Sequence, residues 1–172
     1  MEVPLANEFF RRQLQSYASV HRDPRNKATH FLGIPVIVFS LLLILSLWRI
    51  NLGREVTMAM VVSVIAVLGW MALDMGIGLV MALLMLVAWY ASEALMVVLG
   101  PSSTWVAFFV LFVGGWALQF LGHHFEGKRP ALLDNIFQAF VGPMFLVAEA
   151  MVVMGLRRDL APLMGERTVT AR

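Results

Sequence analysis

The chain has 172 residues, of which 60% are hydrophobic and only 14% are charged, whereas soluble proteins average about 45–50% apolar and about 25% charged residues. This composition argues against an ordinary soluble domain, and the mean hydropathy of +0.80 favours a membrane protein. The net charge is only +2 and no basic run exceeds two residues, so we expect no binding to nucleic acid. Cysteine is absent, which excludes disulfides and thiolate-bound metals.

The N-terminal segment, residues 1–22, is predicted to form an amphipathic helix lying on the membrane surface. A helix packed at the edge of a protein core would have the same pattern, and that interpretation stays open here. After it, Asp23 resembles a helix N-cap and Pro24 the first helical residue, so a new helix is expected to begin there. The apolar residues on one face of the N-terminal helix are Leu5, Phe9, Leu14 and Tyr17.

Four long apolar stretches, of which three are uncharged and one carries only Glu93, are predicted to cross a membrane. At a rise of 1.5 Å per residue, about 20 residues cover a hydrocarbon core of about 30 Å. Turn sequences separate the stretches: the loop 49–55, the tight turn 74–76 and the segment Gly100-Pro101-Ser102-Ser103. The expected spans are residues 28–48, 56–73, 77–99 and 105–121.

A polar loop, residues 122–130, is followed by a fifth apolar segment, residues 131–156, which carries polar side chains and Pro143. This segment is expected either to span or to re-enter the membrane, and residues 157–172 form a polar tail. We therefore expect one all-α domain, a polytopic transmembrane bundle with four to five spans plus the N-terminal interfacial helix. The lysine and arginine distribution favours a cytoplasmic N-terminus in a bacterial inner membrane or an ER-type membrane, and homodimers are common for such bundles.

The chain's four histidines are expected to meet at one membrane interface. His21 and His30 lie close to the start of the first span, and His123 and His124 follow the fourth span. An even number of spans returns the chain to its starting side, which we expect to be the cytoplasmic one. Imidazole suits iron, zinc, copper or nickel, so a metal site is predicted. Adjacent helical residues point about 100° apart, so one of His123 and His124 is expected to bind the ion and the other to lie beside it.

Polar residues near the histidines are candidates to support them. Gln119 lies four residues before His123, and Asn26 lies four residues before His30, so each amide shares a helical face with an imidazole. Hydrogen bonds between helices are the alternative use of these amides. Glu126 and Asp134 are candidates for oxygen ligands or supporting groups, with solvation or helix capping as the alternative.

Two carboxylates, Glu93 and Glu149, are predicted to lie within membrane segments. Such groups are costly in a bilayer and are functional candidates by default. Counting along their helices places both far from the histidines, so an ion pair at the opposite interface is the favoured interpretation. The arginines expected there are Arg49, Arg54 and Arg157.

Two sequence motifs resemble those of the 2-hydroxy fatty acid dioxygenase family. The first is HRDPRNKATHFLGIP at residues 21–35; the second begins with QFLGH at residues 119–123 and continues with EGKRPALLDNIFQ at residues 126–138. The resemblance extends from about residue 10 to residue 155, although the intervening spans match only in hydrophobicity. It implies an iron(II)-dependent α-oxidation, in which a 2-hydroxy fatty acid and O₂ yield a fatty acid one carbon shorter.

The resemblance also implies roles for individual residues. We predict His21, His30, His123 and His124 as ligands of Fe(II) and, together with Glu126, as the catalytic residues; which of the two consecutive histidines takes the family position stays open. Basic residues at the interface are candidates to steer the substrate carboxylate. The supporting or substrate-contacting residues are Asn26, Gln119, Asp134, Asn135, Gln138, Arg25, Lys128 and Arg129.

Two other function classes use the same features. A zinc-dependent lipid hydrolase would activate water with the same histidines, and a non-enzymatic membrane transporter or scaffold would use Glu93 and Glu149 along a path through the membrane. Membrane desaturases with eight histidines are excluded because this chain has only four. A protein with two histidines on haem is disfavoured because its ligands would be expected deeper in the spans.

Overall fold

The computed structural model describes residues 6–51, 53–128 and 136–165, and most of them lie in helices, as the composition predicted. A short antiparallel hairpin, which the sequence analysis treated as a plain loop, joins the second and third helices. The elements in chain order are α1 (Glu8–Ser19), α2 (Pro24–Leu45), β1 (Arg49–Asn51), β2 (Glu55–Thr57), α3 (Met58–Leu73), α4 (Met75–Glu126), α5 (Phe137–Val153) and the 3-10 helix η2 (Ala161–Met164).

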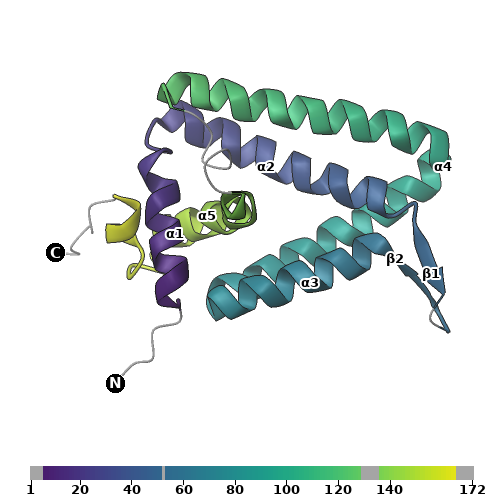
Figure 1. The fold of residues 1–172 in the computed structure, drawn as a ribbon, viewed down its shortest axis with the longest axis horizontal. Helices are drawn as coiled ribbons and strands as arrows, with labels where there is room; N and C mark the ends of the chain where they lie inside the picture. Colours follow the sequence, from purple (N-terminus) through teal and green to yellow (C-terminus); the bar gives the residue numbers. More distant parts are fainter. Residues whose placement is uncertain (1–5, 52, 129–135, 166–172) are drawn as a thin grey trace.

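Helix α4 consists of two straight helices that meet in a sharp bend at Gly100 (Figure 1). The φ angle of Gly100 is 72°, in the left-handed region that residues with a side chain avoid. Pro101 follows at once and has no N–H to continue the first helix. This break was predicted from the sequence. The first half of α4 runs beside α3, and the second half runs beside α2 (Figure 1).

Two helices, α2 and α4, are long and apolar enough to cross a membrane, whereas α3 and α5 are apolar but shorter. Many large apolar side chains on α3 and α4 point outward; Leu83, Val98 and Val110 are examples. Exposed apolar surface of this extent is typical of a face that another apolar phase covers. These observations favour association with a membrane, and the number of spans stays a prediction.

Helix α1 packs into the protein through a buried face. Its N-cap Asn7 accepts a hydrogen bond from the N–H of Phe10, and Phe10, Leu14 and Tyr17 are buried against the core. The sequence pattern predicted Phe9 on this face, and that prediction was wrong, because Phe9 is 43% exposed. Spacings of four and three residues from Phe10 put the buried side chains on one stripe, so the alternative of a helix packed at the edge of a core describes α1 best.

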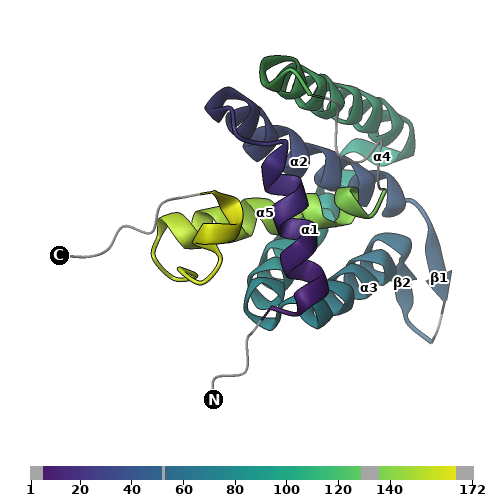
Figure 2. The ribbon, with the colours of Figure 1, turned by 60° about the vertical axis from the view of Figure 1, so that its left-hand side comes forward.

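Helix α5 runs crosswise to the long helices. Figure 1 views it nearly end-on while α2, α3 and α4 lie in the plane of the picture, and Figure 2 shows it extended beneath α2. Most of its side chains are buried, among them Val141, Met144, Phe145 and Ala148. Pro143 lies within the helix without ending it. Helix α5 therefore forms the centre around which α1, α2 and α4 are arranged.

A buried ion pair joins the C-terminal segment to the turn between α3 and α4. Nη1 of Arg157 donates to both carboxylate oxygens of Asp74, at 2.9 and 2.8 Å, and both residues are buried. Oδ1 of Asp74 also accepts the N–H of Ile77 at 2.9 Å and so caps α4. From the sequence, Asp74 was predicted only as part of a turn, and Arg157 as a partner of membrane carboxylates; the prediction for Arg157 was wrong.

Replacing Asp74 by alanine should lower the free energy of unfolding by about 3 kcal/mol, because α4 loses its N-cap and a buried guanidinium loses one of its two carboxylate partners, the other being the more exposed Asp159. Chemical unfolding of the detergent-purified protein measures this value. The control is Glu55→Ala, which removes a carboxylate that pairs with Arg49 at the surface and should cost about 0–1 kcal/mol. Equal losses in the two variants would contradict the importance given to the buried pair.

Candidate metal site

Three histidines from separate parts of the chain meet in the structure. His21 follows the end of α1, His30 lies near the start of α2, and His123 lies in the last turn of α4. Each offers one ring nitrogen, and these three atoms lie within 4.8 Å of one another. The three residues are buried, with exposed fractions of 2%, 2% and 6%. The sequence predicted that all four histidines meet. The structure brings together the first two and His123, the first of the consecutive pair.

Glycines allow α2 and the second half of α4 to approach closely enough for this meeting. A methyl group at Gly122 would come within 2.5 Å of Oδ1 of Asn26, and one at Gly115 would come within 2.6 Å of Cγ1 of Ile37. Any side chain at these positions would push the helices apart. In the adjacent pair Gly114-Gly115, the close approach rests on Gly115, since a methyl group at Gly114 would meet open space.

The hydrogen bonds of His21 and His30 define which ring nitrogen carries a proton. Nδ1 of His21 lies 2.7 Å from the carbonyl oxygen of Tyr17, and Nδ1 of His30 lies 2.9 Å from that of Asn26. A carbonyl oxygen only accepts, so both Nδ1 atoms must donate, and in a neutral imidazole Nε2 then has no hydrogen. The two bare Nε2 atoms face each other at 3.1 Å.

Two lone pairs at this distance repel each other unless a positive charge lies between or beside them. A proton is a poor candidate, because burial lowers the pKa of His21 to about 3 and keeps its imidazole neutral. A metal ion suits the arrangement: histidine ligands commonly donate their other N–H to a backbone carbonyl, which fixes the ring. The geometry of these two histidines thus fits a bound cation.

The third histidine adds an unsatisfied donor atom. Within the described part of the chain, Nδ1 of His123 is buried and has no hydrogen-bond partner, whereas buried polar atoms are almost always paired. A metal ion would satisfy it. The donor set of three neutral imidazoles fits iron, zinc, copper or nickel, and among the described residues no carboxylate joins the cluster.

Tyr17 supports the site although the sequence analysis did not select it. Its carbonyl oxygen orients His21, and its ring stacks on the His21 ring with a centroid distance of 3.9 Å and an angle of 1° between the planes. Tyr17 precedes His21 by four residues, as Asn26 precedes His30. The spacing that drew attention to Asn26 could therefore have identified Tyr17 as well.

Glu126 holds the turn between α1 and α2 against the end of α4. Its carboxylate accepts the backbone N–H groups of Arg22 and Asp23 at 3.0 and 2.8 Å and the side-chain amide of Asn26 at 3.1 Å. These bonds keep His21 close to His123. The structure thus places Glu126 beside the histidines, with its oxygens engaged by N–H groups, and we assign it a positioning role.

His124 points away from the cluster. It is exposed, and its ring lies near that of Phe125, with a centroid distance of 6.1 Å. The adjacent position on a helix is rotated by about 100°, so the burial of His123 directs His124 outward. We therefore leave His124 out of the proposed ligand set.

The amides predicted to support the site have different surroundings. The backbone carbonyl of Asn26, rather than its side chain, orients His30. Gln119 and Gln138 are buried and line a cavity beside the histidines, and the amide nitrogen of Gln138 donates to Gln13 at 2.6 Å. The predicted residues Arg129, Asp134 and Asn135 lie outside the described residues.

The basic residues predicted to steer a carboxylate lie at the protein surface. Arg25 pairs with Asp23 at 2.8 Å and lies over the ring of Phe125. Lys128 donates to the carbonyl oxygen of Ser19 at 2.7 Å. Neither side chain lines the cavity beside the histidines, so any effect on a substrate would act over a distance.

That cavity has a volume of about 340 Å³ and extends from the histidines between α2, the second half of α4 and the N-terminal half of α5. Its polar lining is confined to one end. Among the described residues, the polar or aromatic-polar contributors are Tyr17, His21, His30, Gln119, His123 and Gln138, and the larger apolar contributors are Ile34, Ile37, Val38, Leu41, Phe112 and Trp116.

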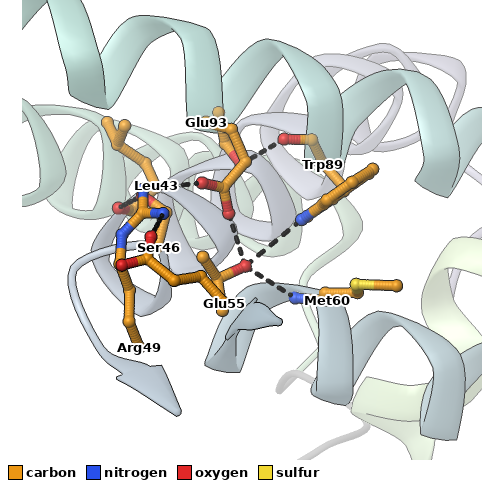
Figure 3. Close-up of polar contacts among 9 residues, drawn as sticks. Leu43, Ser46, Arg49, Glu55, Met60, Trp89 and Glu93 are labelled. Atoms are coloured by element: carbon orange, nitrogen blue, oxygen red, sulfur yellow. Dashed lines mark hydrogen bonds and ion pairs between the residues drawn. The ribbon is translucent and has the colours of Figure 1, made fainter. Parts of the chain in front are cut away.

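The two membrane carboxylates have different partners. Glu93 pairs with Arg49 at 3.3 Å and accepts a hydrogen bond from Thr57, as predicted for the interface far from the histidines (Figure 3). The same expectation for Glu149 was wrong, because Glu149 pairs with Lys27 at the start of α2. The crosswise path of α5 brings Glu149 to the histidine end of α2.

Removal of a ligand should release the metal. In His30→Ala and His123→Ala, the affinity for an added divalent metal ion should fall by more than the ~10–100-fold that loss of a residue supporting a ligand costs. The helical circular dichroism signal should stay unchanged. Elemental analysis after dialysis measures the bound metal. His124→Ala is the matched control and should retain the wild-type content. Full occupancy in His30→Ala and His123→Ala would rule out the ligand assignment.

The lowered pKa of His21 makes the stability of the metal-free protein depend on pH. Below about pH 6.5 the unfolded chain binds a proton at this position, whereas the folded protein does not until about pH 3. Stability should therefore fall as the pH drops through this window, by about 2 kcal/mol between pH 7 and pH 5 for this group. Unfolding titrations at the two pH values test this; a His21→Gln variant should show a smaller fall, and an identical fall would refute the assignment.

Comparison with known proteins places the chain in a family. The family model described as "Mpo1-like: 2-hydroxy-palmitic acid dioxygenase Mpo1-like" matches residues 7–154. The 2-hydroxy-palmitic acid dioxygenase MPO1 of Saccharomyces cerevisiae is 33% identical over 147 residues, which cover 84% of this chain and 81% of the yeast protein. No solved structure matches the chain. The matched region contains all three clustered histidines, and the chain belongs to the Mpo1-like family of 2-hydroxy fatty acid dioxygenases.

Proposed function

We propose that this protein is an iron(II)-dependent dioxygenase that shortens 2-hydroxy fatty acids by one carbon at a site near a membrane interface. The observation that carries the proposal is the buried cluster of three neutral imidazoles, in which two bare Nε2 atoms face each other at 3.1 Å. Membership of the family supplies the reaction class, and the curated yeast relative is named for 2-hydroxy-palmitic acid.

His21, His30 and His123 would hold the ion. Zinc has no redox chemistry, so among the metals that accept imidazole, a redox metal such as iron agrees with a dioxygenase. Bound Fe(II) would supply the one-electron and O₂ chemistry that protein side chains lack. The second substrate that we propose is O₂, and an ion held by these three histidines would remain accessible to both substrates.

The residues around the histidines prepare the site for this chemistry. The carbonyl groups of Tyr17 and Asn26 fix the rings of His21 and His30, and burial of the three imidazoles excludes bulk water. Gln119 and Gln138 line the same end of the cavity. Their amides would hydrogen-bond the carboxylate and the 2-hydroxyl of a substrate and so hold its first two carbons beside the histidines.

The apolar part of the cavity suits the acyl chain. Beyond the histidines and glutamines, its walls are formed by side chains such as Ile34, Val38 and Trp116. Burial of an alkyl chain against such walls contributes about 0.8 kcal/mol per methylene group. The net reaction cleaves the bond between C1 and C2, and the balance with O₂ as the only oxidant is one shortened fatty acid, one carbon dioxide and one water.

A lipid substrate agrees with a protein that lies in a membrane. Helices α2 and α4 are long and apolar enough to span, and the histidines lie at the start of α2 and the end of α4, where two spanning helices would leave the bilayer on one side. We propose an integral membrane protein with this site at the cytoplasmic interface. The homodimer expected from the behaviour of small bundles stays a prediction.

The function is tested by purifying the protein anaerobically in detergent, with and without added Fe(II), and measuring bound metal and O₂ uptake on addition of 2-hydroxypalmitic acid. We expect stoichiometric iron, substrate-dependent O₂ uptake and pentadecanoic acid as the product. His124→Ala should behave as wild type, while His123→Ala should show no uptake above the rate without enzyme.

Two other results of this experiment would indicate a different function. Bound zinc without O₂ uptake would favour a hydrolase with the same histidines, because three imidazoles also hold catalytic zinc in other enzymes. Failure to retain any metal would contradict both metal enzymes and would leave the transporter or scaffold interpretation.

A further inference from the structure

The lining of the cavity beside the histidines changes from polar and buried at one end to apolar and exposed at the other. At one end His21, His30, Gln119 and His123 are all buried. At the other end Leu41 is 40% exposed, and Phe112 is half-buried. The cavity is therefore closed where it is polar and open where it is apolar.

Two helices that run side by side in opposite directions, α2 and the second half of α4, form the walls from the polar end to the apolar end. On α2 the lining side chains run from His30 to Leu41, and on α4 they run back from His123 to Phe112. Figures 1 and 2 both show α2 and the second half of α4 side by side over this stretch. Each path covers eleven residue steps, or about 16 Å at 1.5 Å per residue. One leaflet of a bilayer has a similar hydrocarbon depth of about 15 Å.

The surface around the open end is apolar. Near Phe112, the side chains of Phe109 and Val113 are exposed on α4, and Trp105 is partly exposed one further turn away. No exposed charged side chain lines the cavity among the described residues. Acyl chains of a bilayer would satisfy this surface, whereas water would not.

We propose that the cavity is a groove open to the lipid phase, through which the substrate enters sideways from one leaflet. The proposal rests on the proposed function. The carboxylate end of the 2-hydroxy acid lies at the histidines, and its methyl end emerges between Leu41 and Phe112. A substrate longer than the groove continues into the bilayer, so the protein sets a minimum chain length and no maximum.

The dependence of activity on chain length distinguishes an open groove from a closed pocket. The wild-type enzyme is reconstituted with Fe(II) in phosphatidylcholine vesicles, and kcat/KM is measured for acids from 2-hydroxyoctanoic to 2-hydroxydocosanoic at equal mole fractions in the membrane. An open groove gives a rise followed by a plateau. A sharp fall at the longest acids would show a closed end and would overturn the proposal.

A tryptophan at position 41, at the open end of the cavity, should obstruct the longest acids, so that kcat/KM falls for them instead of staying constant. Leu41→Trp should lower kcat/KM for the longest acids by roughly tenfold or more, the effect of a misfit in an apolar pocket, while acids too short to reach position 41 keep their wild-type values. Leu32→Trp is the matched control, because Leu32 is on the same helix, is 59% exposed and does not line the cavity. A Leu41→Trp profile identical to that of Leu32→Trp would refute the proposal.

A binding measurement keeps this test separate from the test of function. Radiolabelled 2-hydroxydocosanoic acid is bound to the metal-free protein in the same vesicles. Leu41→Trp should weaken this binding and Leu32→Trp should not, whether or not turnover occurs. If the protein binds no iron and turns nothing over, but Leu41→Trp still weakens binding of the acid, only the proposed function is contradicted. If the wild type turns over short acids but not the longest ones, only the open groove is contradicted.

Discussion

The facing pair of bare ring nitrogens in His21 and His30 is the constraint on which the site depends. Each ring is fixed because its other nitrogen donates to a carbonyl oxygen four residues earlier. This arrangement leaves two lone pairs 3.1 Å apart in a buried setting, and a buried polar group without a partner is costly. A bound cation would remove the cost and would thereby couple folding around the histidines to metal binding.

The rest of the fold holds the three helices that carry these rings. Helix α1 is fastened at both ends: Asn7 bonds to the carbonyl groups of Ala72 and Leu73, and Glu126 accepts the N–H groups that follow α1. The Asp74–Arg157 pair secures the C-terminal segment at the same turn that receives Asn7. A polar anchor therefore lies at either end of an otherwise apolar packing surface. The Asp74–Arg157 pair is buried, where water competes little, whereas the side-chain bond of Asn7 and the bond from Arg22 to Glu126 are exposed.

The site combines a small polar end with a long apolar approach, as the chemistry of a 2-hydroxy fatty acid requires. Only the first two carbons of such a substrate carry oxygen, and among the described residues the hydrogen-bonding side chains that line the cavity gather with the histidines. The far carboxylate, Glu93, belongs to a separate network with Arg49 and Thr57 that ties the β-hairpin to α4. Because Glu93 already has an arginine and a hydroxyl as partners, its presence in an apolar helix does not call for a transport path. This agrees with an enzyme rather than a transporter.

Local sequence patterns determined the helices, the breaks at Asp74 and Gly100, and the presence of histidines at matching ends of two long helices, because caps, turns and spacings of four residues act between near neighbours. Packing decided the rest. Which of His123 and His124 faces inward depends on how α4 is rotated about its axis, and that rotation follows from its close contact with α2 at Gly115 and Gly122. The pairing of Glu149 with Lys27 depends on the crosswise path of α5, which no local pattern specifies because it results from burying α5 against α1, α2 and α4 at once.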